Sequence, residues 1–305
     1  MIYKDWLINW LTNYVEPSVK HRTYIHYKVI AEKRLLPRLG NMEIGQIRPY
    51  ELQCFVSDLL KSGNLNTGEG LSPNSVNSII SVLQGSLRAA YSIGLINEYV
   101  GDKIKRPKVV EKKVDCFSVL EQKQIESYIL NEEKERYFGV LLCLYTGLRI
   151  GELLALEWTD IDMNNGELYV NKTCYYVKTY GRAVYAPKTP SSVRTVPIPK
   201  QLMPYLCEEK KKSRSTHIVT SGDKPISIRV YQQSFSLLLK RLKIRHRGFH
   251  SLRHTFATRA LECGMDVKTL SELLGHRSPT VTLNRYAHSL SEHKRKMMNK
   301  LGDML

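Results

Sequence analysis

Apolar residues recur at helical spacing along most of this chain, and one stretch in the middle breaks the pattern. Residues 166–199, "GELYVNKTCYYVKTYGRAVYAPKTPSSVRTVPIP", alternate instead and read as three strands separated by "TYGR" and "KTPSS". Helical spacing begins before this stretch, at Ser118, and returns after it from Val230 to the end. The sequence therefore predicts a mainly α fold of the α+β class with one small antiparallel sheet.

The first hundred residues carry the helical pattern alone and predict a small bundle of short helices. One helix is expected to begin with Ser72 as N-cap and Pro73 at its first position, and to run to Gly94. The chain after it is rich in lysine and short of core residues, which is typical of an exposed linker. We therefore expect an all-α domain, a linker and a second domain, over residues 1–106, 107–114 and 115–305.

The charge of the chain is strongly positive and unevenly divided. Its 46 Lys and Arg against 29 Asp and Glu give a net charge of +17. Residues 1–106 hold 13 basic and 9 acidic residues, or +4, so the remainder carries +13. Such a balance favours a polyanionic partner, bound mostly by the second part of the chain.

Several classes of protein are excluded. The six cysteines are scattered without a C-x-x-C pair, so neither a disulfide framework nor a cysteine zinc site is indicated. The N-terminus lacks the order of a signal peptide, and no apolar run approaches the roughly 20 residues that span a bilayer. We expect a cytoplasmic, nucleoid-associated protein without a membrane partner.

Arg149 and Glu152 lie three residues apart in "TGLRIGELLALEW". On a helix this spacing places both side chains on one face. A guanidinium that the glutamate holds in position can bind two phosphate oxygens. The alternative is an ordinary surface ion pair, which would contribute little.

His250 and Arg253 repeat this spacing in "HSLRHTFATRA", so an imidazole and a second guanidinium face the same way. His250 and His254 also have the i, i+4 spacing of a metal-binding pair, but Ser251 stands where the zinc-protease pattern has glutamate. We therefore expect no metal, and interpret His254 as a structural, hydrogen-bonded histidine.

The stretch "GMDVKTLSELLGHRSPTVTLNRYAH" predicts two short helices joined by a tight turn. Asp266 suits the N-cap of the first helix and Gly275 its C-terminal turn. His276 then follows a helix end, and Tyr286 lies about two turns into the second helix, which begins at Pro279. Two alternatives stay open: Tyr286 as a core aromatic packed with Leu283, and a helix-turn-helix that reads DNA.

Together these motifs resemble the tyrosine recombinases, also called the phage integrase family. The order of the family signature falls on Arg149, Lys188, His250, Arg253, His276 and Tyr286, and "TGLRIGEL", "HSLRHTFAT", "LGH" and "NRYAH" stand in family context. Lys188 lies in "PKTPSSVRTVPI", between the second and third predicted strands, as the family's lysine does. The resemblance extends to residues 1–106, which look like the family's core-binding domain.

The resemblance implies a chemistry of DNA cleavage and rejoining. Tyr286 would be the nucleophile that forms a 3′-phosphotyrosyl bond, while Arg149 and Arg253 neutralise the phosphate, without a cofactor or a metal. His276 and His250 would hydrogen-bond the phosphate, and His250 would also take the Tyr286 proton. Lys188 would protonate the leaving 5′ oxygen, with Lys172 and Lys178 as competing lysines, and Glu152 would support the site.

The expected partner is double-stranded DNA carrying recombination sites. The tail, residues 290–305, resembles the family's tail, which docks on a neighbouring protomer and builds a tetramer; packing on its own domain is the alternative. An excisionase and a host DNA-bending protein are candidate further partners. The biological role stays open between a phage or mobile element and Xer-like resolution of replicon dimers, with a type IB topoisomerase and a non-catalytic DNA-binding protein as competing readings.

Overall fold

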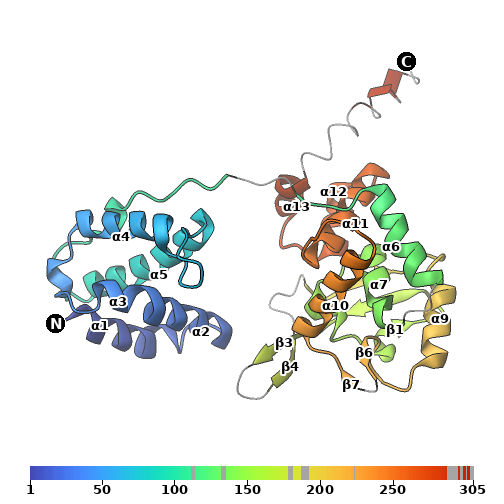
Figure 1. Ribbon diagram of the computed structural model, residues 1–305, viewed down its shortest axis with the longest axis horizontal. Coiled ribbons are helices and arrows are strands. Elements are labelled where there is room, and N and C mark those ends of the chain that lie inside the picture. The colour runs from blue at the N-terminus through green and yellow to red at the C-terminus, as the bar shows by residue number, and fades with distance from the viewer. Residues whose placement is uncertain are drawn as a thin grey trace. The chain divides into compact units, whose positions relative to one another are not determined.

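The chain divides into two compact units, Met1–Glu111 and Lys112–Leu305 (Figure 1). The computed structural model describes residues 1–110, 114–131, 135–177, 181–186, 192–222 and 224–286, together with 295, 298–299 and 301–302. The division lies inside the stretch where we expect a linker. Each unit has a large apolar core of its own.

The first unit is entirely helical. Its helices are α1 (Tyr3–Trp10, continued as a π-helix over Leu11–Val15), α2 (His21–Ile30, continued over Ala31–Leu35), α3 (Leu36–Leu39), α4 (Pro49–Ser62) and α5 (Pro73–Ser92), with 3₁₀ turns at Ile44–Gln46 and Gly101–Lys103. The predicted start of α5 is confirmed, since the Ser72 side chain accepts a hydrogen bond from the Ser75 amide and Pro73 follows it. The apolar pattern of α2 is weak, and Ile30 is the one residue of this helix that is buried.

The second unit is mainly helical as well. Its helices are α6 (Val119–Asn131), α7 (Phe138–Thr146), α8 (Ile150–Leu153), α9 (Met203–Lys212), α10 (Ile228–Arg241), α11 (His250–Glu262), α12 (Val267–Leu274) and α13 (Pro279–Tyr286), with 3₁₀ turns at Glu135–Tyr137 and Trp158–Asp160. The apolar α7 is buried and packs against α11. No helix in the described part of the chain is long and apolar enough to cross a membrane.

The strands of the second unit form three small antiparallel sheets rather than one. The largest has the order β1-β2-β5 (Ile161–Asp162, Glu167–Val170, Arg194–Pro197), and two hairpins pair β3 with β4 (Thr173–Val177, Gly181–Tyr185) and β6 with β7 (Thr220–Ser221, Lys224–Pro225). The mainly helical class is confirmed.

The prediction of three strands in one sheet is wrong in detail. The first predicted strand divides at Asn171 and Lys172 into β2 and β3. The Lys172 ammonium pairs with Asp160 at 2.9 Å and with Glu157. The alternation of apolar and polar residues in the sequence does not predict these contacts.

The last described helices, α11 to α13, lie together at the upper side of the second unit in Figure 1. They share a small core. Asp266 caps α12 by accepting a hydrogen bond from the Thr269 amide at 2.9 Å, and Gly275 ends it in the left-handed region, as predicted. This packing brings Tyr286, the last residue of α13, against α11.

Candidate active site

Arg149 and Glu152 form a local pair around a single helical turn. Gly147 ends α7 with φ +66°, and α8 follows as one turn, shorter than the helix the sequence suggests. Arg149 Nη1 donates to Glu152 Oε1 at 2.6 Å, and the Arg149 amide donates to Oε2 at 3.0 Å. The Arg149 side chain keeps 35% of its surface exposed, so part of the guanidinium faces solvent.

A third arginine, Arg194 of β5, completes this pair, and the sequence analysis did not single it out. Its Nη2 lies 2.9 Å from Glu152 Oε2 and its Nη1 lies 3.2 Å from Oε1. Burial raises the pKa of Glu152, but the hydrogen bonds and charges of Arg194 and Arg149 outweigh it and hold the pKa at about 2. The carboxylate is therefore ionised at every physiological pH.

Three arginines also converge on the last carbonyl groups of α12. Arg194 Nε donates to the Leu273 carbonyl at 2.6 Å, Arg253 Nη2 to Leu274 at 2.6 Å, and Arg149 Nη2 to Gly275 at 3.1 Å. These carbonyls have no partner within the helix and carry its partial negative charge. The arginines thus fix the turn from which His276 emerges.

Arg253 is the most buried of the three, with 1% of its surface exposed. Its Nη1 donates to the Gly147 carbonyl at 2.8 Å, so this one side chain ties the end of α7 to the end of α12. Burial first, and then the charge of Arg149, lower the pKa of Arg253 to about 9, which still leaves it protonated at neutral pH.

Tyr286 and His254 form the hydrogen bond that the sequence analysis missed. The Tyr286 hydroxyl lies 2.8 Å from His254 Nδ1, and the His254 ring also stands edge-on to His250, with centroids 4.5 Å apart. His254 is hydrogen-bonded, as interpreted, but its partner is the candidate nucleophile. Tyr286 is 1% exposed and belongs to the small core, whereas Leu283 is 45% exposed.

The three histidines of the site are neutral at pH 7. Loss of hydration is the largest cause in each, and the charges of nearby arginines add to it; the pKa falls to about 4 for His250 and His276 and to about 3 for His254. His276 Nδ1 is fixed at 2.7 Å from Thr282 Oγ1. Burial raises the pKa of Tyr286, and Arg253 and Arg285 oppose that rise.

The structure does not test the role predicted for Lys188. Lys188 and Lys178 lie outside the described residues. Lys172, the other competitor, is held by Asp160 and Glu157. These ion pairs occupy its ammonium group.

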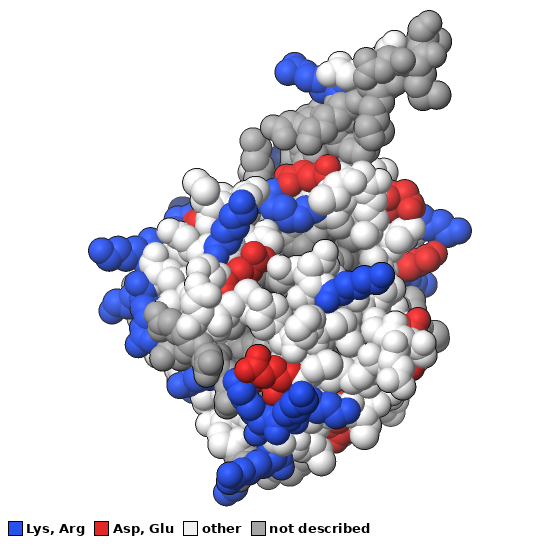
Figure 2. Space-filling model, turned by 90° about the vertical axis from the view of Figure 1, so that its right-hand side faces the viewer, with Lys and Arg blue, Asp and Glu red and all other residues white. Residues whose placement is uncertain are grey.

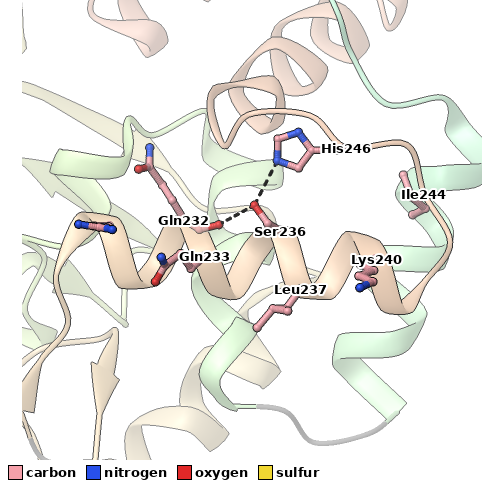
Figure 3. Close-up of a pocket in the computed structure, with 8 residues that line it drawn as sticks. Gln232, Gln233, Ser236, Leu237, Lys240, Ile244 and His246 are labelled. Atoms are coloured by element: carbon pink, nitrogen blue, oxygen red, sulfur yellow. Dashed lines mark hydrogen bonds between the residues drawn. The ribbon is translucent and has the colours of Figure 1, made fainter. Parts of the chain in front are cut away.

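The surface of the second unit also has a hollow along α10. Figure 3 shows a hollow whose lining includes Ser236 and His246, joined by a 3.2 Å contact between Ser236 Oγ and His246 Nε2. The full lining is Arg229, Gln232, Gln233, Ser236, Leu237, Lys240, Ile244 and His246. On the face shown in Figure 2, Lys and Arg lie along the left and lower edges and in the upper part, and Asp and Glu are scattered among them.

The arrangement brings guanidinium groups, neutral imidazoles and a tyrosine hydroxyl into one part of the second unit. Guanidiniums suit the binding of a phosphate, and a hydroxyl beside an imidazole suits nucleophilic attack. The sequence model of the Phage integrase family matches residues 118–293, and that of the Phage integrase N-terminal SAM-like domain matches residues 2–60.

The chain belongs to the phage integrase family. Its enzymes are the tyrosine recombinases. A relative named tyrosine recombinase XerC-like, from Caldanaerobacter subterraneus, is 30% identical over 98% of this chain and 82% of its own length. The ICEBs1 integrase of Bacillus subtilis is 28% identical over 95% of this chain and 80% of its own length.

Solved structures of integrases share the fold. The Tn1549 transposon integrase in complex with transposon right end DNA has a TM-score of 0.84 at 22% identity, covering 99% of this chain and 100% of that chain. A lambda integrase dimer bound to a core site has a TM-score of 0.70 at 20% identity, covering 94% and 77%. The tyrosine recombinase fold thus extends over both units.

Proposed function

We propose that this tyrosine recombinase cleaves and rejoins DNA through a 3′-phosphotyrosyl intermediate on Tyr286. The observation that carries the proposal is the Tyr286 hydroxyl, hydrogen-bonded to a neutral imidazole on the same helix as Arg253. Attack by the hydroxyl oxygen forms a bond to phosphorus and breaks the bond from phosphorus to the 5′ oxygen. The bond energy is kept in the phosphotyrosine, so rejoining to a new strand needs no ATP.

In this proposal the arginines neutralise the charge that the phosphate develops. Phosphoryl transfer depends mainly on positioning and on charge stabilisation. A guanidinium has five N–H donors, so Arg149 and Arg253 can each hold backbone carbonyls and still donate to a phosphate oxygen. His276 and His250 add hydrogen bonds, Lys188 protonates the leaving 5′ oxygen, and Glu152 orients Arg149.

The two units take different parts of the task in the same proposal. Residues 1–106, within the first unit, form a core-binding domain that binds the duplex, and residues 107–114 link it to the catalytic domain. Residues 290–305 dock on a neighbouring protomer in a tetramer. The ICEBs1 integrase and the Tn1549 integrase support a role in a mobile element, with Xer-like dimer resolution as the alternative.

The hollow along α10 is a candidate DNA contact in this scheme. Arginine reads guanine and glutamine reads adenine through paired hydrogen bonds in the major groove. Arg229, Gln232 and Gln233 supply these groups on one helix, with Lys240 for a phosphate. Gln233→Ala should lower the affinity for the cognate site more than the affinity for random DNA of equal length.

A suicide substrate tests the proposal. A duplex of the recombination site, nicked beside the scissile phosphate, loses its 5′-hydroxyl strand after cleavage and traps the covalent adduct. The unaltered protein should form the adduct, and Tyr286→Phe should bind the DNA but form none. If the unaltered protein forms no adduct, the chain is a DNA-binding protein without catalysis. If it relaxes supercoils but does not exchange strands between two sites, it is a topoisomerase.

A further inference from the structure

His254 is the described residue that hydrogen-bonds the Tyr286 hydroxyl, and the recombinase mechanism above gives it no role. The distance from Nδ1 to the hydroxyl oxygen is 2.8 Å. This contact joins α11 to α13 across 32 residues of sequence. Within the described part of the chain, no hydrogen bond joins His250 to Tyr286.

We propose that His254, rather than His250, accepts the proton of Tyr286 when its oxygen attacks the phosphate. The inference rests on the proposed function. As the bond from oxygen to phosphorus forms, the O–H bond breaks and the proton moves to His254 Nδ1. The bond to the 5′ oxygen breaks with its electron pair, and that oxygen takes its proton from Lys188. His250 is then free to hydrogen-bond the phosphate.

The geometry suits this transfer. A proton acceptor must lie within about 2.6–3.2 Å of the proton's oxygen, and His254 Nδ1 meets that condition before any substrate is bound. The ring is held from two sides, edge-on by His250 and by the Tyr286 ring, with centroids 4.5 and 5.8 Å away. Its orientation is therefore set by packing rather than by the hydroxyl alone.

Burial and the nearby positive charges keep His254 unprotonated at neutral pH before the phosphate binds. Burial is the largest cause that lowers its pKa to about 3, followed by the electrostatic effects of His250, Arg285, Arg253 and His276 in that order. A neutral imidazole with its hydrogen on Nε2 offers a lone pair on Nδ1. A phosphodiester that binds the arginines adds negative charge nearby, which raises the pKa of His254 and strengthens it as an acceptor.

A purely structural role is the competing explanation, and His254→Asn separates the two. The asparagine carbonyl oxygen can accept the hydrogen bond from Tyr286, but it cannot hold a proton at neutral pH. His217 supplies a matched control, since it is also a histidine of the second unit with a depressed pKa, and it contacts Thr216 and Glu157, away from the proposed machinery.

The experiment measures single-turnover adduct formation on the nicked suicide duplex between pH 5 and 9. We expect His254→Asn to keep its melting temperature at neutral pH and its DNA affinity, and to slow at least about 100-fold. The rate of the unaltered protein should stay level between pH 5 and 8 because His254 is neutral there. The rate of His254→Asn should instead rise with pH, because without a base only the ionised tyrosine attacks. His217→Asn should match the unaltered protein. A rate within about threefold for His254→Asn, or a slow rate with an unchanged pH profile, overturns the inference. Absence of any adduct from the unaltered protein instead overturns the proposed function.

Discussion

Arg194 and Glu152 form a two-point ion pair inside the second unit, with N to O distances of 2.9 and 3.2 Å. Both side chains are almost fully buried, at 6% and 5% exposed. The same glutamate orients Arg149, and the same arginine holds the Leu273 carbonyl. One interior ion pair therefore fixes both Arg149 and the turn that carries His276.

Breaking this pair should destabilise the catalytic domain strongly. Arg194→Ala leaves the Glu152 carboxylate with Arg149 as its remaining cation, and loss of one partner of a buried pair costs about 3–5 kcal/mol. Urea unfolding of the second unit should show a loss in this range. Arg245→Ala is the control, because its pair with Asp115 is exposed and should contribute about 1 kcal/mol or less. Equal losses for both variants would contradict a structural role for Arg194.

Gly147 should tolerate no side chain. Its φ of +66° disfavours any other residue, and a Cβ there would lie 2.5 Å from Phe256 Cδ1 and 2.9 Å from Leu274 Cδ2. Gly166 has nearly the same φ, +65°, but its nearest neighbours lie at 3.8 Å or beyond. Gly166→Ala should therefore cost about 1–2 kcal/mol, and Gly147→Ala about 1–3 kcal/mol more, in the same unfolding measurement. Similar losses for both would show that the crowding at Gly147 relaxes freely.

The sequence predicts those parts of the fold and of the site that depend on local signals. Asp266, Gly275 and the Ser72 N-cap are read correctly because each acts on backbone groups within a few residues of itself. The sequence does not predict the roles of Arg194 and His254, because their partners, Glu152 and Tyr286, lie 42 and 32 residues away along the chain. Helical spacing shows which residues share a face, but it does not show which distant group that face meets.

The stability of the second unit should fall as pH drops from 7 to 5. His250, His254 and His276 have pKa values near 4, 3 and 4 when folded, against about 6.5 when unfolded. Between these values the unfolded chain binds more protons, so acid favours unfolding. Glu152, with a pKa of about 2, loses its contribution only below about 4.5, outside this window.

The matched variant for this effect is His254→Asn. Removing one such histidine should reduce the slope of unfolding free energy against pH by about one proton. Urea titrations at half-unit steps give this slope directly. An unchanged slope would mean that His254 titrates normally in the folded protein.

Lys188 gives a test that depends on the identity of the leaving atom. If Lys188 protonates the 5′ oxygen as it leaves, Lys188→Ala should fail on ordinary DNA, whereas a 5′-phosphorothiolate has a leaving sulfur that hardly needs a proton. Sulfur should therefore restore adduct formation to Lys188→Ala. Arg253→Ala should stay at least about 100-fold slow on either substrate, because charge stabilisation is still required.

Lys172 is the competing lysine. Because Asp160 and Glu157 hold its ammonium group, we expect the sulfur substrate to leave the rate of adduct formation by Lys172→Ala unchanged. Rescue of Lys172→Ala with Lys188→Ala still inactive would transfer the role to Lys172, and its ammonium would then have to leave both carboxylates to reach the DNA.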